Sequence, residues 1–396
     1  MTAAPGGPGR RAAPSAGAPR DVSLSFAGFS EEPEELRTVK LCLLGFGSVA
    51  RALCELLAAQ ERTLAERHGL RVLVSAAGTR RGSLVEPAGL APAEVLAAAG
   101  GSGVLPQPPR PAAELLAASG AGVLAELTVM GDLSGVAAGD TTYRPPATDH
   151  VLGAFRLGMD VVTANKGPIA WTWPEVAAAA QASRRRIRFE STVMDGLPVF
   201  SLLEYTLPDC AVLGFEAVFN ATTNFLIDAM GASRTYEDAL AQVQAEGYAE
   251  ADPGNDVDGW DAASKACALA NVAMGAGITP ADVERESLRD VPLERILRAR
   301  EEGKRLRLVS RVWRGPLAGG ASPAAPPDLE RGRVRASLRA EELDIDHPLA
   351  AVSGESLGAL LHTDLMADVL VSERHALVPQ TAYGVYADLL HLCRTR

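Results

Sequence analysis

The feature that most restricts the fold of this chain is a glycine-containing turn between a buried strand and a helix. The run VKLCLL at 39–44 has the continuous apolar character of a buried strand, and GFGSVA at 45–50 interrupts it. Apolar residues then recur at helical spacing at Val49, Leu53 and Leu57. The order of strand, tight turn and helix predicts the first unit of an α/β domain.

Three more strand-like runs follow this unit and alternate with helical segments. RVLVSAA covers 71–77, GVLAELTV covers 122–129 and DVVTAN covers 160–165, with a helix-like segment at 147–158. Strands that are separated by helices pair in parallel, because a parallel neighbour needs a long crossover. We therefore expect an N-terminal Rossmann-type dinucleotide-binding domain over residues 37–186.

The pattern changes after residue 186 to a less regular order of strands and helices. Strand-like runs are RIRFESTV, AVLGFEAVF, LRLVSRVW and RVRASLRA, and helical stretches occupy about 222–246 and 259–275. We expect a second, mixed-sheet α+β domain over 187–340 that binds substrate and forms a dimer contact. The helix-like TAYGVYADLLHLC lies in a C-terminal segment, 341–396, which we expect to return to the nucleotide-binding domain.

Two segments lack the periodicity of regular structure. Residues 1–36 are rich in Ala, Pro and Gly and then acidic, which predicts a disordered tail. Arg10, Arg11 and Arg20 resemble an organelle-import segment, but the Pro and Gly content would break the amphipathic helix that such a segment needs. PLAGGASPAAPP at 316–327 predicts a loop.

Composition excludes several classes of partner. The 396 residues carry a formal net charge of −11, whereas nucleic acid and anionic membranes attract basic patches. No run approaches the roughly 18 to 20 apolar residues that span a bilayer. The 5 cysteines are scattered without zinc-ligand spacing, so we expect core thiols in a reducing cytoplasm. A local cluster of basic residues could still hold a small anionic ligand.

Gly45 and Gly47 belong to a G-x-G-x-x-A pattern that ends at Ala50, directly between the first strand and its helix. Glycine there permits close approach of the backbone to a pyrophosphate, and the free amides of the helix N-terminus hold its charge. Alone the pattern is weak, and a merely tight turn is the alternative. Its place in the first unit of an alternating domain favours nucleotide binding, with Ser48 and Val49 beside the glycines.

The end of the second strand indicates which dinucleotide is preferred. Domains that prefer NAD place an acid there for the ribose hydroxyls, but this chain has Thr79, Arg80 and Arg81. A guanidinium suits a 2′-phosphate through paired hydrogen bonds. We expect NADP to be preferred over NAD, and the alternative is that both arginines belong to a solvated loop.

Asn165 and Lys166 follow the apolar part of DVVTAN, just beyond the carboxyl end of a parallel strand. Ligands of parallel sheets bind at that edge. A lysine there is a stronger site candidate than a lysine on a helix face, and an exposed loop amine is the alternative.

The segment GYAEADPGNDVDGWDAASK, 247–265, concentrates acids and ends on a lysine. The segment does not fit a calcium-binding loop. When the glycine that such a loop requires is aligned on Gly259, Lys265 takes the position of the bidentate acid. A solvated acidic turn and a helix cap at Asp258 remain as alternatives. Neither explains why Asp261 and Lys265 share one helix face at i and i+4.

Beside a nucleotide, an aspartate and a lysine one turn apart form a proton-handling pair. The carboxylate of Asp261 would orient the ammonium of Lys265, which exchanges a proton with a substrate oxygen as hydride moves. Glu250 and Asp256 would then receive a substrate ammonium or hydroxyl.

Together these motifs resemble the homoserine dehydrogenase family. The matching segments are GFGSVA, AELT at 125–128, VVTANKG, FESTVMDGLPVF at 189–200, FNATTNFL at 219–226 and the acidic segment at 247–265. The similarity covers about residues 38–278 well and the remainder loosely. It implies NAD(P)-dependent interconversion of L-homoserine and L-aspartate 4-semialdehyde, in the threonine and methionine branch of aspartate metabolism.

The resemblance also implies roles for individual residues. Lys265 would be the catalytic amine, Asp261 its essential partner, and Lys166 would lie beside the nicotinamide and the substrate. Further substrate contacts would come from Glu250, Asp256 and Thr222. Cofactor contacts from the motifs would come from Gly45, Gly47, Ser48, Val49, Arg80, Arg81, Thr128, Thr163, Asn165 and Lys166. A sodium ion would bind Glu190, Val193, Asp195 and Leu197, mainly through backbone carbonyls.

Several residues depart from the family pattern. Met194 and Asp195 stand where the family has a glycine pair, Ala221 replaces a glycine, and Asn255 replaces a common acid. SERHALVPQ at 372–380 replaces a glycine-rich segment. Because of these changes, two alternative functions stay open. The chain could be another Rossmann dehydrogenase of an amino-acid alcohol or aldehyde, or a relative that binds the dinucleotide without catalysis. We expect a homodimer, and no C-terminal regulatory domain because the chain ends shortly after TAYGVYADLLHLC.

Overall fold

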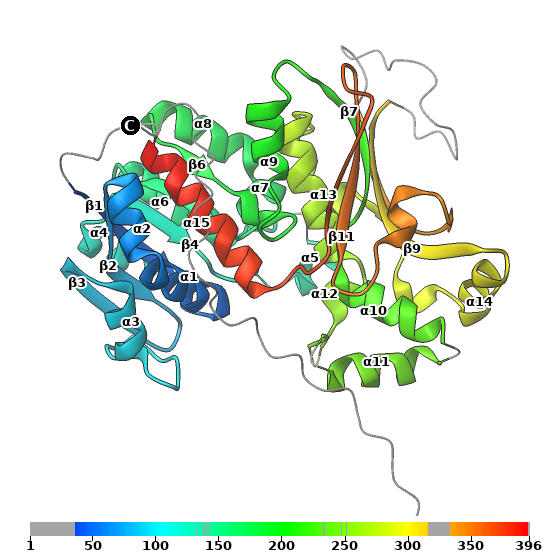
Figure 1. Ribbon diagram of the computed structural model, residues 1–396, viewed down its shortest axis with the longest axis horizontal. Helices are drawn as coiled ribbons and strands as arrows, with labels where there is room; N and C mark the ends of the chain where they lie inside the picture. Colours follow the sequence, from blue (N-terminus) through cyan, green and yellow to red (C-terminus); the bar gives the residue numbers. More distant parts are fainter. Residues whose placement is uncertain are drawn as a thin grey trace, which may run out of the picture.

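The computed structural model describes residues 36–394 except 132, 138, 141, 233, 247, 251 and 316–332. The predicted tail, up to residue 35, and the predicted loop at 316–327 lie outside the described residues. Two sheets with their helices lie side by side, the N-terminal one in blue and cyan and the second in yellow and orange (Figure 1). The predicted fold class, a Rossmann-type unit followed by a second mixed sheet, is confirmed.

The first sheet has the strand order β3-β2-β1-β4-β5-β6. Its strands are β1 (Arg37–Leu44), β2 (Leu70–Gly78), β3 (Ser83–Leu90), β4 (Val123–Glu126), β5 (Asp160–Thr163) and β6 (Ile187–Arg188). Neighbouring strands are parallel except β2 and β3, which are antiparallel. The strand order reverses between β1 and β4, so ligands of such a sheet bind in the crevice at the carboxyl ends of these two strands.

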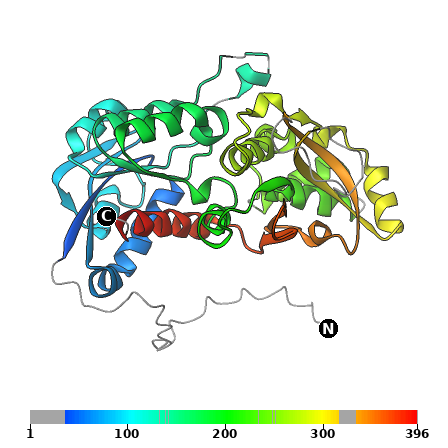
Figure 2. The same ribbon diagram turned by 90° about the horizontal axis from the view of Figure 1, so that it is seen from above.

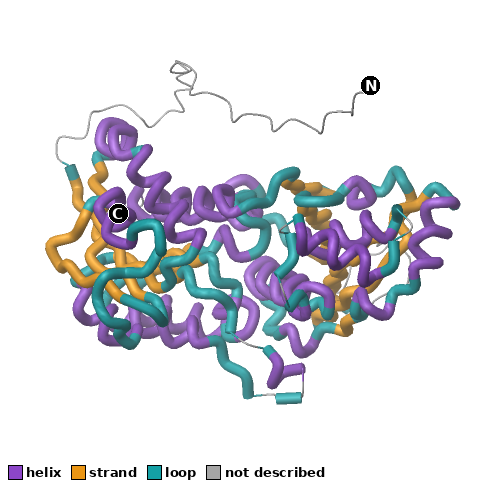
Figure 3. The backbone as a smooth tube through the Cα atoms, turned by 90° about the horizontal axis from the view of Figure 1, so that it is seen from below, coloured by secondary structure: helices purple, strands orange, loops and turns teal. Residues whose placement is uncertain are grey.

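Helices cover both faces of the first sheet, as Figures 2 and 3 show. The helices of this unit are α1 (Ser48–Ala59), α2 (Glu61–His68), α3 (Pro92–Ala99), α4 (Ala112–Ser119), α5 (Ser134–Ala137), α6 (Pro146–Arg156), α7 (Gly167–Trp171), α8 (Trp173–Ser183) and α15 (Val378–Arg394). Leu41 and Leu43 pack with α1, α3 and α15, whereas Cys42 and Leu44 pack with α4, α6 and α8. The continuous apolar run of β1 thus fits a strand that is buried on both faces.

The second sheet has the strand order β12-β11-β7-β9-β10-β8 and is antiparallel except between β10 and β8. Its strands are β7 (Val212–Val218), β8 (Glu284–Arg285), β9 (Lys304–Arg314), β10 (Val334–Asp344), β11 (Leu357–Thr363) and β12 (Asp368–Glu373). The accompanying helices are α9 (Val199–Ser201), α10 (Ala221–Met230), α11 (Tyr236–Ala245), α12 (Gly254–Val257), α13 (Trp260–Ala273) and α14 (Leu293–Glu301). Ala263, Cys267 and Leu269 of α13 are fully buried in the apolar core of this unit.

The C-terminal segment, expected over 341–396, contributes to both units. β11 and β12 pair within the second sheet, whereas α15 packs on α1 and buries Val385 and Leu389 in the first core. The red helix in Figure 1 lies beside the blue helices accordingly. Of this segment, α15 packs on the first unit, whereas β11 and β12 belong to the second. No helix in the described part of the chain is long and apolar enough to cross a bilayer.

Two strands end before their apolar runs do. β4 ends at Glu126 and β5 ends at Thr163, although GVLAELTV and DVVTAN continue past both residues. The side-chain amide of Asn165 donates to the backbone carbonyls of Thr128 and Val129 at 2.9 and 3.4 Å. A side chain thus satisfies the carbonyls that a longer strand would have paired.

RIRFESTV differs from its predicted strand. Only Ile187–Arg188 is extended, and it pairs with β5 in the first sheet, so that sheet runs past the boundary expected at residue 186. The 3₁₀ turn η1 (Glu190–Thr192) follows. The buried carboxylate of Glu190 accepts the backbone N–H groups of Phe200 and Ser201, which closes the following segment into a loop.

The helical stretch predicted at about 222–246 is two helices, α10 and α11. The second begins because the hydroxyl of Thr235 accepts the backbone N–H of Asp238 and caps a new helix. The hairpin partner β3 and the pair β11 and β12 were not predicted from the sequence.

Gly45 makes the turn between β1 and α1 possible. Its φ of +90° is strained for other residues, and a Cβ atom there would lie 2.4 Å from the carbonyl oxygen of Leu127. Gly47 has a φ of −88°, and a Cβ atom there would meet nothing within 4 Å. The fold therefore requires Gly45, whereas Gly47 keeps space open at the N-terminus of α1.

Gly45→Ala should destabilise the protein by about 2–4 kcal/mol, because backbone strain and a clash with the neighbouring loop add together. Gly47→Ala is the matched control and should change stability by less than about 0.5 kcal/mol. Thermal unfolding of both variants measures the difference. Equal melting temperatures for the two variants would contradict the assignment.

Candidate active site

The carboxyl edge of the first sheet borders a cavity of about 280 Å³ that residues of the second unit also line. The lining consists of Gly47, Ser48, Val49, Leu127, Thr128, Val129, Ala164, Lys166, Ser191, Thr192, Val193, Asp195, Asp261, Lys265 and Thr381. These residues follow β1, β4 and β5 or lie in the 191–195 loop, α13 and α15. The structure therefore brings the glycine turn and the predicted Asp261–Lys265 pair into one cavity.

Asp261 lies between two lysines. Its Oδ1 is 3.0 Å from Nζ of Lys166, and its Oδ2 is 3.2 Å from Nζ of Lys265. Lys166 belongs to the first unit, whereas Asp261 and Lys265 are one turn apart on α13. Nζ of Lys265 also donates to the carbonyl oxygen of Phe219 at 2.8 Å. An ammonium has three N–H groups, so one of them remains for a ligand.

Burial and neighbouring charges set the proton affinities of this pair. Burial by itself would raise the pKa of Asp261, but the ammonium groups of Lys265 and Lys166 hold that pKa well below its usual range. Burial would lower the pKa of Lys265, but the carboxylates of Asp261 and Asp195 raise it above its usual value. At neutral pH the pair is an ionised carboxylate and a protonated amine.

Asn220 connects two acids of the site and was not predicted from the sequence. Its Nδ2 donates to Oδ1 of Asp256 at 2.7 Å and to Oδ2 of Asp261 at 3.0 Å. Burial and the charge of Asp261 raise the pKa of Asp256. Thr222 donates to the carbonyl of Tyr248 at 3.1 Å and also bonds to Asp256. The predicted substrate residues Asp256 and Thr222 thus belong to the network around Asp261, and neither lines the cavity.

Thr163 and Asn165, predicted as cofactor contacts, anchor the loops instead of lining the cavity. The hydroxyl of Thr163 donates to the carbonyl of Glu126 at 2.9 Å and accepts the N–H of Asn165 at 2.9 Å. Thr128 does line the cavity, but its hydroxyl donates to the carboxylate of Glu126 and accepts the amide of Asn165. These bonds fix the loop after β4 against the end of β5.

Glu250 lies outside the lining of this cavity. Its side chain is exposed, and its backbone carbonyl accepts the side-chain amide of Gln244 at 2.9 Å.

Arg80 and Arg81 are exposed in the turn that follows β2. The hydroxyl of Thr79 shapes this turn by accepting the N–H groups of Arg81 and Gly82, each at 3.1 Å. The N–H of Gly45 bonds to the last residue of β2 at 2.9 Å, so the turn is adjacent to the glycine turn.

The predicted sodium ligands lie in the 190–197 loop beside the cavity. The carboxylate of Glu190 is already engaged by two backbone N–H groups at 2.7 and 2.8 Å, and burial raises its pKa. The backbone carbonyl of Leu197 accepts a backbone N–H at 2.8 Å. Among the described residues, no group of three or more His, Cys, Asp or Glu side chains is placed to hold a metal. A cation at this loop would therefore depend on backbone oxygens.

The sequence patterns did not point to Ser191, Thr381 or Glu373. Near the start of α15, the hydroxyl of Thr381 donates to Oδ1 of Asp195 at 2.9 Å, and both residues line the cavity. Ser191 donates to the backbone carbonyl of Thr381 at 2.8 Å. Burial and the charge of Asp195 raise the pKa of Glu373 to about 7. The only signal was the helix-like TAYGVYADLLHLC, which does not indicate the loop that this helix contacts.

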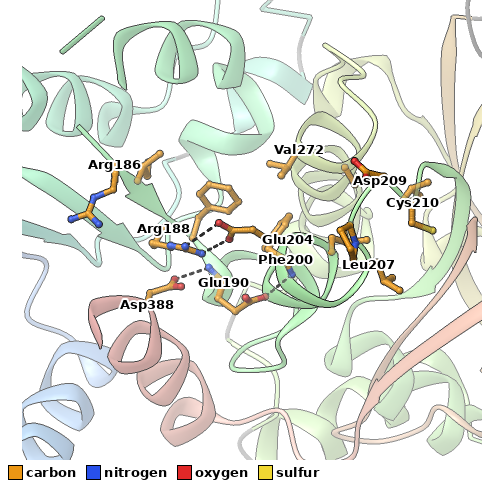
Figure 4. A pocket seen from close by; sticks show the side chains of 16 residues that line it. Arg186, Arg188, Glu190, Phe200, Glu204, Leu207, Asp209, Cys210, Val272 and Asp388 are labelled. Carbon is orange, nitrogen blue, oxygen red and sulfur yellow. Dashed lines mark hydrogen bonds and ion pairs between the residues drawn. The ribbon is translucent and has the colours of Figure 1, made fainter. Parts of the chain in front are cut away.

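A larger cavity of about 760 Å³ is lined by residues from the segments 186–190 and 200–212, from α13 and from α15 (Figure 4). Its charged groups are mostly matched: Arg188 pairs with Glu204 at 2.5 Å, and Asp388 accepts the N–H of Glu190 at 2.8 Å. Burial raises the pKa of Asp388 to about 8. Neither the glycine turn nor Lys166 or Lys265 lines this cavity.

Three comparisons with known proteins agree. A family model described as homoserine dehydrogenase matches residues 198–390. The NAD(+)-dependent homoserine dehydrogenase of Pseudomonas canavaninivorans is 32% identical over 358 residues, which are 89% of this chain and 96% of that enzyme. The homoserine dehydrogenase of Mycobacterium tuberculosis is 33% identical over 252 residues, which are 63% of this chain and 55% of that enzyme.

Among solved structures, a hyperthermophilic archaeal homoserine dehydrogenase in complex with NADPH has a TM-score of 0.72 and 25% identity, with 91% of this chain and 99% of that chain covered. The match to the relative from Pseudomonas spans nearly its whole length. The chain belongs to the homoserine dehydrogenase family of nicotinamide-dependent oxidoreductases.

Proposed function

We propose that the cavity between the two units is the active site, where Lys265 exchanges the proton of the homoserine dehydrogenase reaction. In oxidation, L-homoserine loses a hydride from the carbon that bears its hydroxyl and a proton from that hydroxyl, and L-aspartate 4-semialdehyde forms. Reduction reverses both transfers. The observation that carries the proposal is the shared lining: Lys265, Asp261 and Lys166 border the same space as Gly47.

The glycine turn fits a dinucleotide. Gly47 leaves space open around its Cα, and the first N–H groups of α1 have no side-chain cap, so they are free to bind a pyrophosphate. Ser48 and Val49 border the same space. The dinucleotide, when bound, supplies hydride transfer at its nicotinamide ring.

Lys265 acts on the substrate oxygen. In reduction its ammonium donates a proton to the developing alkoxide, and in oxidation its neutral amine removes the hydroxyl proton. Asp261 and the carbonyl of Phe219 hold two of its N–H groups, which leaves one direction for the substrate. Lys166, bound to the other oxygen of Asp261, presents a second positive charge for the substrate carboxylate and would lie beside the nicotinamide of a bound dinucleotide.

The three remaining substrate contacts are Asp256, Thr222 and Glu250, and different observations support them. Asp256 and Thr222 act through the network around Asp261, to which hydrogen bonds join them. Glu250 is proposed from its motif alone, because its exposed side chain stands outside the cavity lining.

NADP is the proposed preference over NAD. Arg80 and Arg81 make no side-chain ion pair with any residue that the structure describes, and the turn that holds them has no acid for ribose hydroxyls. The relative from Pseudomonas is named NAD(+)-dependent, whereas the archaeal structure contains NADPH. The preference therefore rests on this turn.

A sodium ion on backbone carbonyls of Glu190, Val193, Asp195 and Leu197 belongs to the proposal. The loop geometry supports backbone ligands, because the carboxylate of Glu190 already accepts the N–H groups of Phe200 and Ser201.

A cytoplasmic homodimer that acts in threonine and methionine biosynthesis is the proposed setting. Leu365 and Met366, at the turn between β11 and β12, are 68% and 57% exposed, and Leu370 on the edge strand β12 is 47% exposed, which suits a contact between second sheets. None of the five cysteines forms a disulfide, as is typical of a reducing compartment. The pathway follows from the substrate.

The two alternative functions are not favoured. The family likeness spans nearly the whole Pseudomonas relative, and this argues against a dehydrogenase of another substrate class. The departures at Asp195 and Ala221 leave the ion pair of Asp261 and Lys265 intact, which argues against loss of catalysis.

Lys265→Ala should lower turnover about 100-fold or more, the range for loss of a positioned acid or base. NADPH should still bind, because the glycine turn is untouched. Nicotinamide absorbance measures turnover, and cofactor fluorescence measures binding. Lys304→Ala removes an amine outside the cavity and should retain wild-type turnover. Unchanged turnover in Lys265→Ala would remove this residue from the mechanism.

The rate of homoserine oxidation should still rise at the alkaline end of its pH profile, because the oxidation needs neutral Lys265 and neighbouring carboxylates raise the pKa of that amine. Asp261→Asn removes the carboxylate that stabilises the ammonium and leaves the charge of Lys166 nearby, so the rise should move to lower pH. Asp195 and Asp256 face the amine in both proteins. A rise at the same or higher pH in the variant would refute this account.

Arg80→Ala should raise KM for NADP about 10-fold or more and leave KM for NAD nearly unchanged, because the lost interaction is with the 2′-phosphate. Arg62→Ala, on the exposed face of α2, is the matched control. Steady-state kinetics with each coenzyme measures both constants. An equal effect of Arg80→Ala on the two coenzymes would argue against phosphate binding.

A further inference from the structure

Three arginines of the second unit converge on a small cavity away from the candidate active site. Its volume is about 200 Å³, and it lies where the ends of α10 and α14 meet the start of β9. Figure 1 shows α14 at the end of the second unit that is remote from the first sheet. The cavity is lined by Ile227, Asp228, Gly231, Ile296, Arg300, Arg305, Leu306 and Arg307, none of which borders the cavity of Lys265.

The charges of this lining are unbalanced. Among the described residues that border the cavity, three are arginines and only Asp228 is an acid. Both oxygens of Asp228 are already engaged. Its Oδ1 is 3.1 Å from Nη1 of Arg307, and its Oδ2 accepts the backbone N–H of Gly354 at 3.3 Å. One aspartate thus offsets one arginine, and two positive charges remain.

Arg300 and Arg305 have no carboxylate partner among the residues that the structure describes. A guanidinium N–H of Arg300 donates to the carbonyl of Gly231 at the end of α10. One of Arg305 donates to the carbonyl of Lys304 at 2.9 Å. Each guanidinium carries five N–H groups, so most of these donors stay available for a ligand at the cavity.

Arg307 is the buried member of the cluster, and its surroundings leave it incompletely satisfied. It is only 4% exposed, and its Nε has no hydrogen-bond partner in the described part of the chain. Nη1 donates to Asp228 and to the carbonyl of Leu306 at 3.0 Å. Burial lowers the pKa of Arg307, and the charges of Arg305 and Arg300 lower it further against the effect of Asp228. A buried cation with like charges beside it is unfavourable until an anion compensates it.

We propose that this cavity binds a small oxyanion, a phosphate group, through the guanidinium groups of Arg300, Arg305 and Arg307. A guanidinium matches the oxygens of phosphate through paired hydrogen bonds. A phosphate ester carries about 1.5 to 2 negative charges at neutral pH, which balances the two uncompensated arginines. The cavity is smaller than the roughly 300 Å³ or more of pockets that enclose a drug-sized ligand, so the phosphate group itself is the part that it encloses.

An anion at this position would connect three elements of the second unit. Arg300 extends from α14, Arg305 and Arg307 extend from β9, and the cavity also borders the last turns of α10. The other end of α10 begins at its cap Asn220, which bonds to Asp261. The phosphate group would therefore fix the far end of a helix whose first residues belong to the catalytic network.

Calorimetric titration of the enzyme saturated with its nicotinamide coenzyme tests the site, because the coenzyme then occupies the phosphate contacts at the glycine turn. Inorganic phosphate should bind saturably when sodium chloride keeps the ionic strength constant. Arg305→Gln should weaken this binding about 10-fold or more, because charge-assisted hydrogen bonds are lost. Arg300→Gln, at an exposed position of α14, should weaken it as well and provides an independent second variant.

Arg335→Gln is the matched control. Arg335 is an exposed arginine of β10 outside the lining, so its loss changes the net charge equally and should leave phosphate affinity at the wild-type value. Thermal unfolding in chloride alone separates binding from a structural role. Arg305→Gln removes a repulsive neighbour of Arg307 and should not lower the melting temperature, whereas loss of a structural residue lowers it.

Two outcomes would overturn the proposal. One is a wild-type enzyme without saturable phosphate binding, and the other is an equal loss of affinity in Arg305→Gln and Arg335→Gln, which reports only net charge. Glycerol phosphate distinguishes the sources of the phosphate group. Binding as tight as that of inorganic phosphate would support an ester as the occupant, and exclusion of the ester would support the free ion. Oxidation of homoserine does not enter this test, so failure of the proposed function is a separate result.

Discussion

The carboxylate of Asp261, held between two ammonium groups, is the interaction on which the site depends. A buried charge without partners is strongly unfavourable, and here each oxygen of Asp261 meets a lysine at 3.0 or 3.2 Å. Because Lys166 follows β5 while Asp261 lies on α13, the same carboxylate also joins the two units of the molecule. With Asp195, which also lines the cavity, the formal charges of the two lysines and the two aspartates sum to zero.

This arrangement works only if both lysines arrive from fixed directions. Asn165 bonds to the loop after β4 and thereby fixes the end of β5, from which Lys166 extends. Asn220 caps α10 with its Oδ1 and bonds to Asp261 with its Nδ2, so one side chain both starts a helix and orients the carboxylate. The same hydrogen bonds therefore cap the helix and set the geometry of the site.

Features that depend on neighbours in sequence were predictable, and those that depend on distant contacts were not. The turn at Gly45 and the spacing of Asp261 and Lys265 are local, and both are found in the structure. A residue at the end of a strand has no local signal for its direction, and Asn165 turns toward a loop rather than the cavity. The place of Thr381 in the lining was likewise invisible, because it needs α15 to pack against a loop that lies 186 residues earlier.

That contact also connects two departures from the family pattern. Asp195 replaces a glycine, and Thr381 follows the altered segment at 372–380. The two residues share a hydrogen bond of 2.9 Å, so changes that are far apart in sequence form one local structure. A new carboxylate in a cavity requires a partner that holds it, and the hydroxyl of Thr381 supplies one without neutralising the charge. Gly196 and Gly384 allow the close packing that brings the two segments together. The altered segments therefore meet at one wall of the cavity, which Asp195 and Thr381 both line.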